Sequence, residues 1–308
     1  MGASDLSRPP VARRRSDDVV ARRLASIVAA VEDATGAVRA GRPEGIHDLR
    51  VAMRRGRACL RTFRPLFERD RAERLRDELK WMTTMLGSAR DPEVLARRLA
   101  RRLDRLDVEE RMGPVRRELV GGCRAEADRG RATVLAGFET VRYRRLLDEL
   151  AAVAVCPPYR SGRSGRDVAV LLGCVRKEVR RAARRADLAE AQPPGPRRDA
   201  AFHDVRKAAK RVRYAAETVG PLAPSGARRL ARRFEALQDV LGERQDAAVA
   251  RRLLVHEGAR VGVQAAHNGF TYGLLAEQER AAVRAAERRW TGAWHRDTGK
   301  KARRFLSP

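Results

Sequence analysis

Two histidines in this sequence each open a run of basic residues that recur at helical spacing. The first run consists of His47, Arg50, Arg54, Arg57 and Arg61, and the second of His203, Arg206, Lys210 and Arg213. At about 100° per residue, each run falls on one side of a helix, and the first extends about 21 Å along the axis. Guanidinium groups bind phosphate through paired hydrogen bonds, and imidazole can donate to phosphate oxygens. The two runs therefore indicate a binding site for a polyanion.

A solvent-exposed helix face is the alternative explanation for any single arginine-rich helix. Against it, like charges stacked at i, i+3 and i+4 positions repel one another unless an anion compensates them. The nearest acids, Asp48 and Asp204, fall on another side of the helical wheel. Because the same pattern occurs twice, we favour an anion-binding face over a solvated one.

The two histidines hold equivalent positions in the first turn of their helices. If His47 and His203 donate to phosphate oxygens, nearby phosphate should raise the pKa of each imidazole. Alternatively, each could fix the start of its helix through a carboxylate, for which Asp91 and Asp246 are the candidates. We favour phosphate contact over a catalytic role for both histidines.

Asp91 and Asp246 each follow a Leu-Gly pair by a few residues. A glycine commonly ends a helix, so we expect one helix to stop at Gly87 and another at Gly242. The acids would then cap the helices that follow, where a carboxylate suits the helix dipole. Orienting a basic-face histidine or arginine is their alternative role.

An internal repeat relates the two halves of the chain. The segment HDLRVAMRRGR at 47–57 recurs as HDVRKAAKRVR at 203–213, an offset of 156 residues. Further on, LGSARD at 86–91 corresponds to LGERQD at 241–246, an offset of 155 residues. Two motifs in the same order at nearly the same offset predict two homologous halves.

Long stretches of Ala, Leu, Arg and Glu with apolar residues every three or four positions predict an all-α fold. We expect helices at about 17–40, 46–64, 69–87, 91–106, 108–130 and 138–153, and then at 166–190, 199–219, 225–241, 246–258 and 264–290. The predicted organisation is a disordered basic N-terminus at 1–16, a first helical bundle at 17–153, a linker at 154–165, a second bundle at 166–290 and a basic tail at 291–308.

The amino-acid composition of the chain restricts the class of ligand that we expect it to bind. The 308 residues carry 67 Lys and Arg against 40 Asp and Glu, a formal charge of +27, and such a charge favours a polyanionic ligand. Aromatic residues make up only 5%, which counts against a protein that stacks on nucleic-acid bases. The four cysteines form no CxxC pair, so neither a zinc site nor a disulfide framework is predicted. Without a long apolar run or a secretory signal, we expect a cytoplasmic protein that does not contact membranes.

Motifs for catalysis are missing from the sequence. There is no glycine-rich phosphate loop, GxSxG segment, HExxH pair or cluster of acids at metal-ligand spacing. We therefore expect no enzymatic activity, no metal and no cofactor. Two alternatives stay open: a nucleic-acid-binding protein, and a histidine phosphotransfer or phosphohydrolase protein that uses His47 or His203.

The repeated motifs resemble those of the CHAD family, the conserved histidine α-helical domain. The resemblance rests on HDLRVAMRRGRACLRTF and FHDVRKAAKRVRYAAE with the later LGSARDPEV and LQDVLGERQDAAVA, and it covers residues from about 17 to 290. It implies two helical bundles related by a pseudo-twofold axis around a basic cavity that binds inorganic polyphosphate. It also implies association with polyphosphate granules and possible contact with polyphosphate-metabolising enzymes. No ExExK strand of a CYTH domain is present, so a stand-alone domain is expected.

The resemblance carries the binding role onto matching positions of this chain. The candidate polyphosphate ligands are His47, Arg50, Arg54, Arg55, Arg57 and Arg61 in the first half, and His203, Arg206, Lys207, Lys210, Arg211 and Arg213 in the second. Because polyphosphate has no bases, the scarcity of aromatic residues fits this ligand.

Overall fold

The structure is a computed structural model that describes residues 18–262 and 269–297. Within those residues it consists of helices and connecting turns without a β-strand, so the predicted all-α class is confirmed. The predicted N-terminal segment 1–16 and the last part of the predicted tail, from residue 298, lie outside the described residues. None of the described helices combines the length and the apolar character that crossing a bilayer requires.

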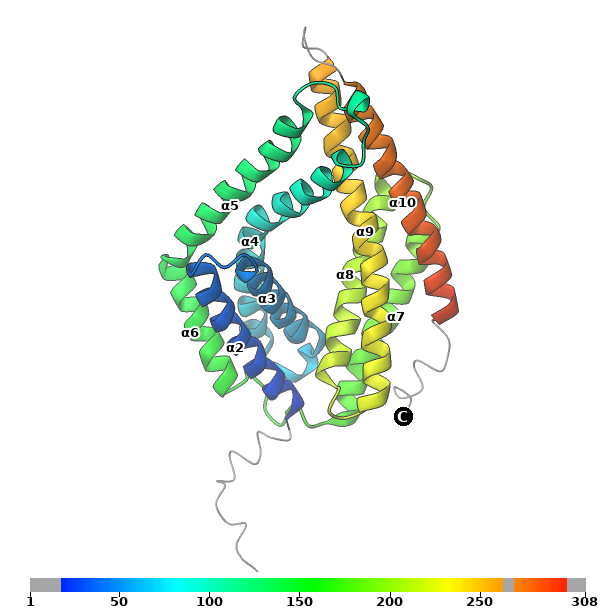
Figure 1. Cartoon of the computed structure of the whole chain (residues 1–308). Coiled ribbons are helices and arrows are strands. Elements are labelled where there is room, and N and C mark those ends of the chain that lie inside the picture. The colour runs from blue at the N-terminus through cyan, green and yellow to red at the C-terminus, as the bar shows by residue number, and fades with distance from the viewer. Residues whose placement is uncertain (1–17, 263–268, 298–308) are drawn as a thin grey trace, which may run out of the picture.

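Two groups of helices lie on opposite sides of the molecule in Figure 1. The first group contains α2 (Val19–Arg39), α3 (Gly45–Thr62), α4 (Arg69–Leu103), α5 (Gly122–Phe138) and α6 (Val141–Val155). The second contains α7 (Val168–Glu190), α8 (Pro196–Thr218), α9 (Pro224–Gly262) and α10 (Phe270–Asp297). In each group a first helix, α2 or α7, is followed by the helix that carries the histidine, α3 or α8, and then by a long helix, α4 or α9. The internal repeat and the pseudo-twofold axis themselves stay predictions.

Two predicted helix breaks were wrong. Helix α4 continues through Gly87 and Pro92, and α9 continues through Gly242, so four predicted helices are two. Neither glycine has the positive φ of a helix-ending residue. The surrounding Ala, Leu, Arg and Glu residues favour helix strongly enough to absorb the ~1 kcal/mol that a mid-helix glycine costs. Asp91 and Asp246 therefore lie within helices, and the prediction that they cap a helix start was wrong.

Two other boundaries differ from the sequence-based expectation. Helix α10 extends to Asp297, so the predicted tail at 291–308 begins inside a helix. The cause is packing, because the rings of Trp290 and Trp294 are buried and stack on each other with centroids 4.9 Å apart. The predicted helix 108–130 divides into a short turn, a π-helical segment at Arg116–Gly121 and α5.

The buried apolar residues form two separate cores. The main core spans both helix groups, because α3 packs against α8 and α7, and α2 packs against α8. A smaller second core joins the far ends of α4 and α9 to the start of α10, with Leu99, Leu254 and Leu275 at its centre. Figure 1 shows α4 and α5 reaching α9 and α10 at this end of the molecule. The two groups are therefore connected at both ends of their long helices.

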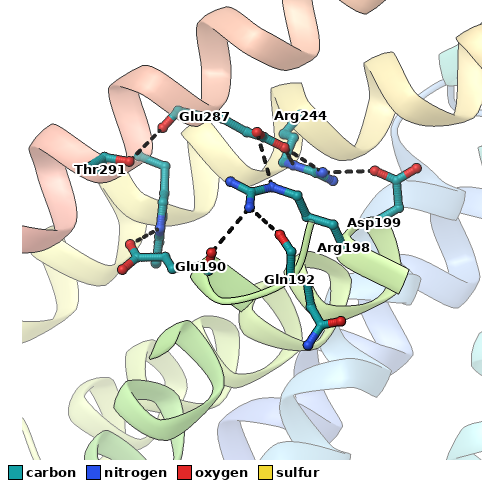
Figure 2. A network of polar contacts seen from close by, with 8 residues as sticks. Glu190, Gln192, Arg198, Asp199, Arg244, Glu287 and Thr291 are labelled. Carbon is teal, nitrogen blue, oxygen red and sulfur yellow. Dashed lines mark hydrogen bonds and ion pairs between the residues drawn. The ribbon is translucent and has the colours of Figure 1, made fainter. Parts of the chain in front are cut away.

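A buried network of charged residues fixes the start of α8, the helix that carries His203 (Figure 2). The guanidinium of Arg244 is only 2% exposed and lies 2.8 Å from Asp199 and 2.7 Å from Glu287. Arg198 contacts the same Glu287 and donates to the backbone carbonyl of Gln192 at 2.6 Å. The network therefore joins the α7–α8 turn to α9 and α10.

Arg244→Ala should destabilise the fold strongly. Removing one partner of a buried ion pair typically costs ~3–5 kcal/mol, because the remaining carboxylates lose their counter-charge. The matched control is Arg252→Ala on the same helix, whose guanidinium is 57% exposed and lies 3.8 Å from Asp199. An exposed pair of this kind contributes ~0–1 kcal/mol. Denaturant unfolding followed by circular dichroism checks both, and equal free energies of unfolding for the two variants would contradict the prediction.

Candidate anion-binding site

One cavity of about 360 Å³ lies where α3, α4, α8 and α9 meet, between the two cores. We call it the central cavity. Its lining residues are His47, Arg50 and Arg54 from α3, Arg90, Asp91, Val94, Leu95 and Arg98 from α4, His203, Arg206 and Lys210 from α8, and Gln245, Asp246 and Val249 from α9. The two histidine-led runs, 156 residues apart in sequence, therefore supply facing walls of one cavity.

The helical wheel explains why basic residues reach this cavity. On α3, Leu49 and Met53 are completely buried in the main core, which fixes the helix and turns Arg50 and Arg54 toward the cavity. On α8, Val205 and Ala208 are buried in the same way, next to Arg206 and Lys210. Alternation of apolar and basic positions at a period of 3.6 residues therefore places the cations.

Asp91 orients an arginine, which is the alternative role that the sequence left open. Its carboxylate receives both terminal nitrogens of Arg50, at 2.5 and 3.2 Å. The same guanidinium lies against Gly87, where an added Cβ would be 3.7 Å from Nη2. Across the cavity, Gly242 stands in the same relation to Arg206, at 3.6 Å. Because glycine has no side chain, each Leu-Gly motif leaves helix backbone uncovered beside one arginine of the cavity.

Several polar side-chain atoms of the cavity residues remain without a hydrogen-bond partner among the described residues. These are the Nε atoms of Arg50, Arg54 and Arg206 and the Nδ1 atom of His203, all buried. A buried polar group without a partner costs free energy, and guanidinium donors without a partner suit an acceptor-rich ligand. Burial also lowers the pKa of Arg54, with Arg50 and Arg206 adding to the effect. The cavity is therefore a region of concentrated positive charge.

Burial also lowers the pKa of both histidines. For His47 the positive charge of Arg90 adds to this effect, and for His203 the charge of Lys207 does so. The free protein therefore holds both imidazoles mainly neutral at pH 7. A bound polyanion would reverse this shift, because opposite charge favours the imidazolium form.

Lys210 and Asp246 have the largest departures from ordinary ionisation in the cavity. Burial, followed by the charges of Arg206, Arg54 and Arg50, lowers the pKa of Lys210 to about 6. Burial raises the pKa of Asp246, although Arg206 works in the opposite direction. Both shifts reduce the number of charged groups in the free cavity.

Six predicted ligands lie outside the central cavity, and most have partners on the protein. Arg211 contacts Glu178, Arg213 contacts Glu217 and Glu235, Lys207 contacts Asp204, and Arg55 lies 3.6 Å from Glu217. Arg57 is partly buried beside Arg76, and Arg61 lines a separate pocket at the other end of α3. The helical wheel of one helix could not show this, because most of these partners come from other helices.

Three polar cavity residues were missed by the sequence analysis: Arg90, Arg98 and Gln245. Arg90 and Gln245 directly precede Asp91 and Asp246, so the aligned LGSARD and LGERQD motifs contained a usable signal. Arg98 lies seven residues after Asp91, on the same face of a continuous helix.

Arg98 connects the central cavity to the second core through ion pairs. Its guanidinium, 7% exposed, lies 2.5 Å from Glu279 on α10 and 3.0 Å from Glu243 on α9. Glu279 is completely buried and also receives Arg102 at 2.9 Å. Because these acids already neutralise Arg98, it contributes less free charge to the cavity than the unpaired arginines do.

The described residues contain no group of three or more His, Cys, Asp or Glu side chains placed to hold a metal ion. The central cavity is instead lined by guanidinium, imidazole and amine groups from two facing helices. Such a donor set suits a ligand rich in anionic oxygen atoms.

The protein-family model of the CHAD domain matches residues 21–255 of this chain. Two proteins of Mycobacterium tuberculosis are each 36% identical to this chain over 244 residues: uncharacterized protein MT2285 of strain CDC 1551 / Oshkosh and uncharacterized protein Rv2226 of strain ATCC 25618 / H37Rv. Each match covers 79% of this chain and 46% of the relative, so the chain spans less than half the length of these relatives.

Two solved structures share the fold. PptA from Streptomyces chartreusis has a TM-score of 0.76 at 23% identity, covering 91% of this chain and 99% of that one. The CHAD domain from the plant Ricinus communis has a TM-score of 0.66 at 26% identity, covering 88% and 90%. The likeness extends over both helix groups, because it covers most of each chain.

Proposed function

Because the chain belongs to the CHAD family, as the family model over residues 21–255 shows, we propose that it binds inorganic polyphosphate without hydrolysing it. The observation that carries the proposal is the central cavity, in which basic side chains of α3 and α8 face one space. Polyphosphate is a flexible chain of anionic oxygens, so unpaired guanidinium donors on opposite walls can hold one segment from two sides.

The family resemblance supports polyphosphate as the ligand. The positive charge of the protein supports a preference for long polyphosphate. Beyond the central cavity, a second pocket at the other end of α3 is lined by Arg61, Arg64, Arg69 and Arg160 among others. A long polyphosphate that leaves the cavity would meet further arginines on the surface, whereas a short one would not. We propose that affinity increases with chain length for this reason.

Calorimetric titration with polyphosphates of defined length tests the proposal directly. Parallel titrations with DNA and RNA of equal charge test the nucleic-acid alternative, which predicts binding that polyphosphate does not displace. Release of inorganic phosphate, or an acid-labile phosphate on His47 or His203, would instead support a phosphohydrolase or phosphotransfer protein. Polyphosphate binding that is weaker than DNA binding at the same salt would overturn the proposal.

Polyphosphate affinity is expected to increase as the pH falls from 8 toward 6. In the free protein the pKa of Lys210 is about 6 and those of His47 and His203 are lowered, so a bound polyanion raises all three and the complex takes up protons. Affinity then changes by up to about tenfold per pH unit for each proton taken up. Above the pKa values of the bound state the gain in affinity is absent, and below the pKa values of the free protein the gain in affinity is complete.

Calorimetry in two buffers of different ionisation enthalpy measures that proton uptake. Lys210→Met should remove the proton uptake near neutral pH. The double variant His47→Asn with His203→Asn should remove the proton uptake nearer pH 6. A double-histidine variant with an unchanged pH profile would assign both imidazoles a structural role. Zero proton uptake at pH 7 in the unaltered protein would contradict the prediction.

We further propose that the protein acts in the cytoplasm at polyphosphate granules, where its ligand is concentrated, with polyphosphate-metabolising enzymes as partners. The support is the family resemblance and the basic lining of the central cavity. A fluorescent fusion should colocalise with stained polyphosphate, and the cavity variants described below should disperse it.

A further inference from the structure

Lys210 is the lysine of the central cavity, and it is surrounded by like charges. Arg206 comes from its own helix α8, Arg50 and Arg54 face it from α3, and Asp246 faces it from α9. Among the described residues, no carboxylate lies within ion-pair distance of its amine. Lys207, three residues earlier, differs in each respect, because it is half exposed and its amine lies 2.5 Å from Asp204.

This environment favours the neutral amine. Burial and three neighbouring guanidinium groups both penalise the ammonium form, in agreement with the lowered pKa of Lys210. A lysine that is desolvated or placed beside other cations becomes a nucleophile at neutral pH. Lys207 has the opposite surroundings, because its amine is half exposed and lies beside the carboxylate of Asp204.

The cavity also contains an apolar wall that a polyphosphate chain does not need. Val94, Leu95 and Val249 line it alongside the basic residues. Its volume of about 360 Å³ is within the range of small-molecule sites. A ligand that uses both walls has a phosphate group for the arginines and a short carbon skeleton for the apolar side chains.

We propose that Lys210 is a reactive amine that captures small phosphate-bearing aldehydes as an imine in the central cavity. The capture rests in part on the proposed phosphate-binding role of the cavity arginines, which would hold the ligand with its aldehyde toward Lys210. The neutral amine forms a bond to the aldehyde carbon, and the resulting carbinolamine loses its oxygen as water, with both amine hydrogens. Asp246 lines the same cavity from α9, and through an intervening water it supplies the proton to the departing hydroxyl and recovers it from the iminium nitrogen.

A bound phosphate does not abolish this reactivity. It raises the pKa of the amine, but because that pKa starts from about 6, the neutral fraction of Lys210 at pH 7.5 stays above that of an ordinary lysine. An ordinary lysine with a pKa near 10.4 is only ~0.1% neutral at that pH. The difference in neutral fraction therefore stays large in the complex.

The probe for the experiment is pyridoxal 5′-phosphate, with borohydride reduction to fix the imine and peptide mass spectrometry to locate it. At pH 7.5 and limiting reagent, Lys210 should be modified at least about tenfold faster than Lys207, because its neutral fraction is larger. Pyridoxal without its phosphate should modify Lys210 at least about tenfold more slowly, because the arginines hold the phosphate. Lys210→Arg removes the amine but keeps a long basic side chain, and it should lose the cavity adduct while modification of Lys207 is unchanged.

Equal modification rates at Lys207 and Lys210 would overturn the inference, and so would equal rates with pyridoxal and its phosphate. Long polyphosphate added before the probe separates the inference from the proposed function. If polyphosphate binds by calorimetry but Lys210 is not preferentially modified, the inference is wrong and the proposed function stands. If Lys210 is preferentially modified but polyphosphate neither binds nor protects it, the proposed function is wrong and the inference stands.

Discussion

Replacing Arg50, Arg54 and Arg206 together by alanine is expected to weaken polyphosphate binding about a hundredfold or more. The three guanidinium groups face the central cavity from two helices, and each has a buried Nε without a partner among the described residues. Hydrogen bonds to charged groups contribute ~1.5–3 kcal/mol each, and even ~1 kcal/mol each in a wet cavity gives the stated loss.

The matched control removes the same number of charges elsewhere. Arg129, Arg144 and Arg145 are exposed on α5 and α6 and do not line the central cavity. Their triple alanine variant should bind nearly as well as the unaltered protein, and both variants should keep their helix content by circular dichroism. A similar loss in both variants would mean that net charge, rather than the cavity, determines binding.

A threefold increase in salt should weaken the binding of a short polyphosphate by about fiftyfold. The reason is counterion release, which gives a log–log slope of about −0.7 for each phosphate charge neutralised by the protein. Arg50, Arg54, Arg90, Arg206 and Lys210 supply about five such charges in the cavity. Arg50 and Arg90 are counted because their partners Asp91 and Glu93 are 68% and 32% exposed, whereas Arg98 is held by the completely buried Glu279. The expected slope is therefore about −3.5.

A long chain that also meets surface arginines should give a steeper slope, about −5 to −6 for eight neutralised charges. The triple variant of Arg50, Arg54 and Arg206 should flatten the slope for a short chain by about two. Titrations at several salt concentrations measure both values. A slope near zero would show that contacts other than charge dominate and would contradict the electrostatic basis of the site.

The central residues of the site could be predicted from the sequence because the determining signal is local. His47, Arg50 and Arg54 share one face of one helix, and the repeat places His203, Arg206 and Lys210 in the same register. The all-α class followed from the same periodicity. That the two faces meet in one cavity depends on how α3 packs against α8, which the helical wheel does not contain.

Where the structure departs from what the sequence suggests, a distant segment determines the outcome, and the ligand role of the residues outside the cavity stays a prediction. Arg211 and Arg213 belong to the basic face of α8 but are neutralised by Glu178 from α7 and Glu235 from α9. Gly87 was expected to end a helix, yet it lies inside α4, beside Arg50 from another helix. In each case the residue type was interpreted from its neighbours in sequence, while its partner lies elsewhere in the chain.

The contact between the two helix groups has a consequence for genetic screens of this protein. Each group supplies only one wall of the central cavity, so ligand binding reports on how the groups are aligned. Glu217 on α8 receives Arg23 from α2 at 2.6 Å and Arg55 from α3 at 3.6 Å, across this junction. A screen for loss of binding should therefore recover substitutions at these three positions although none touches the ligand. Substitutions that loosen the contact between the two helix groups are thus expected to weaken binding, as substitutions in the cavity lining are.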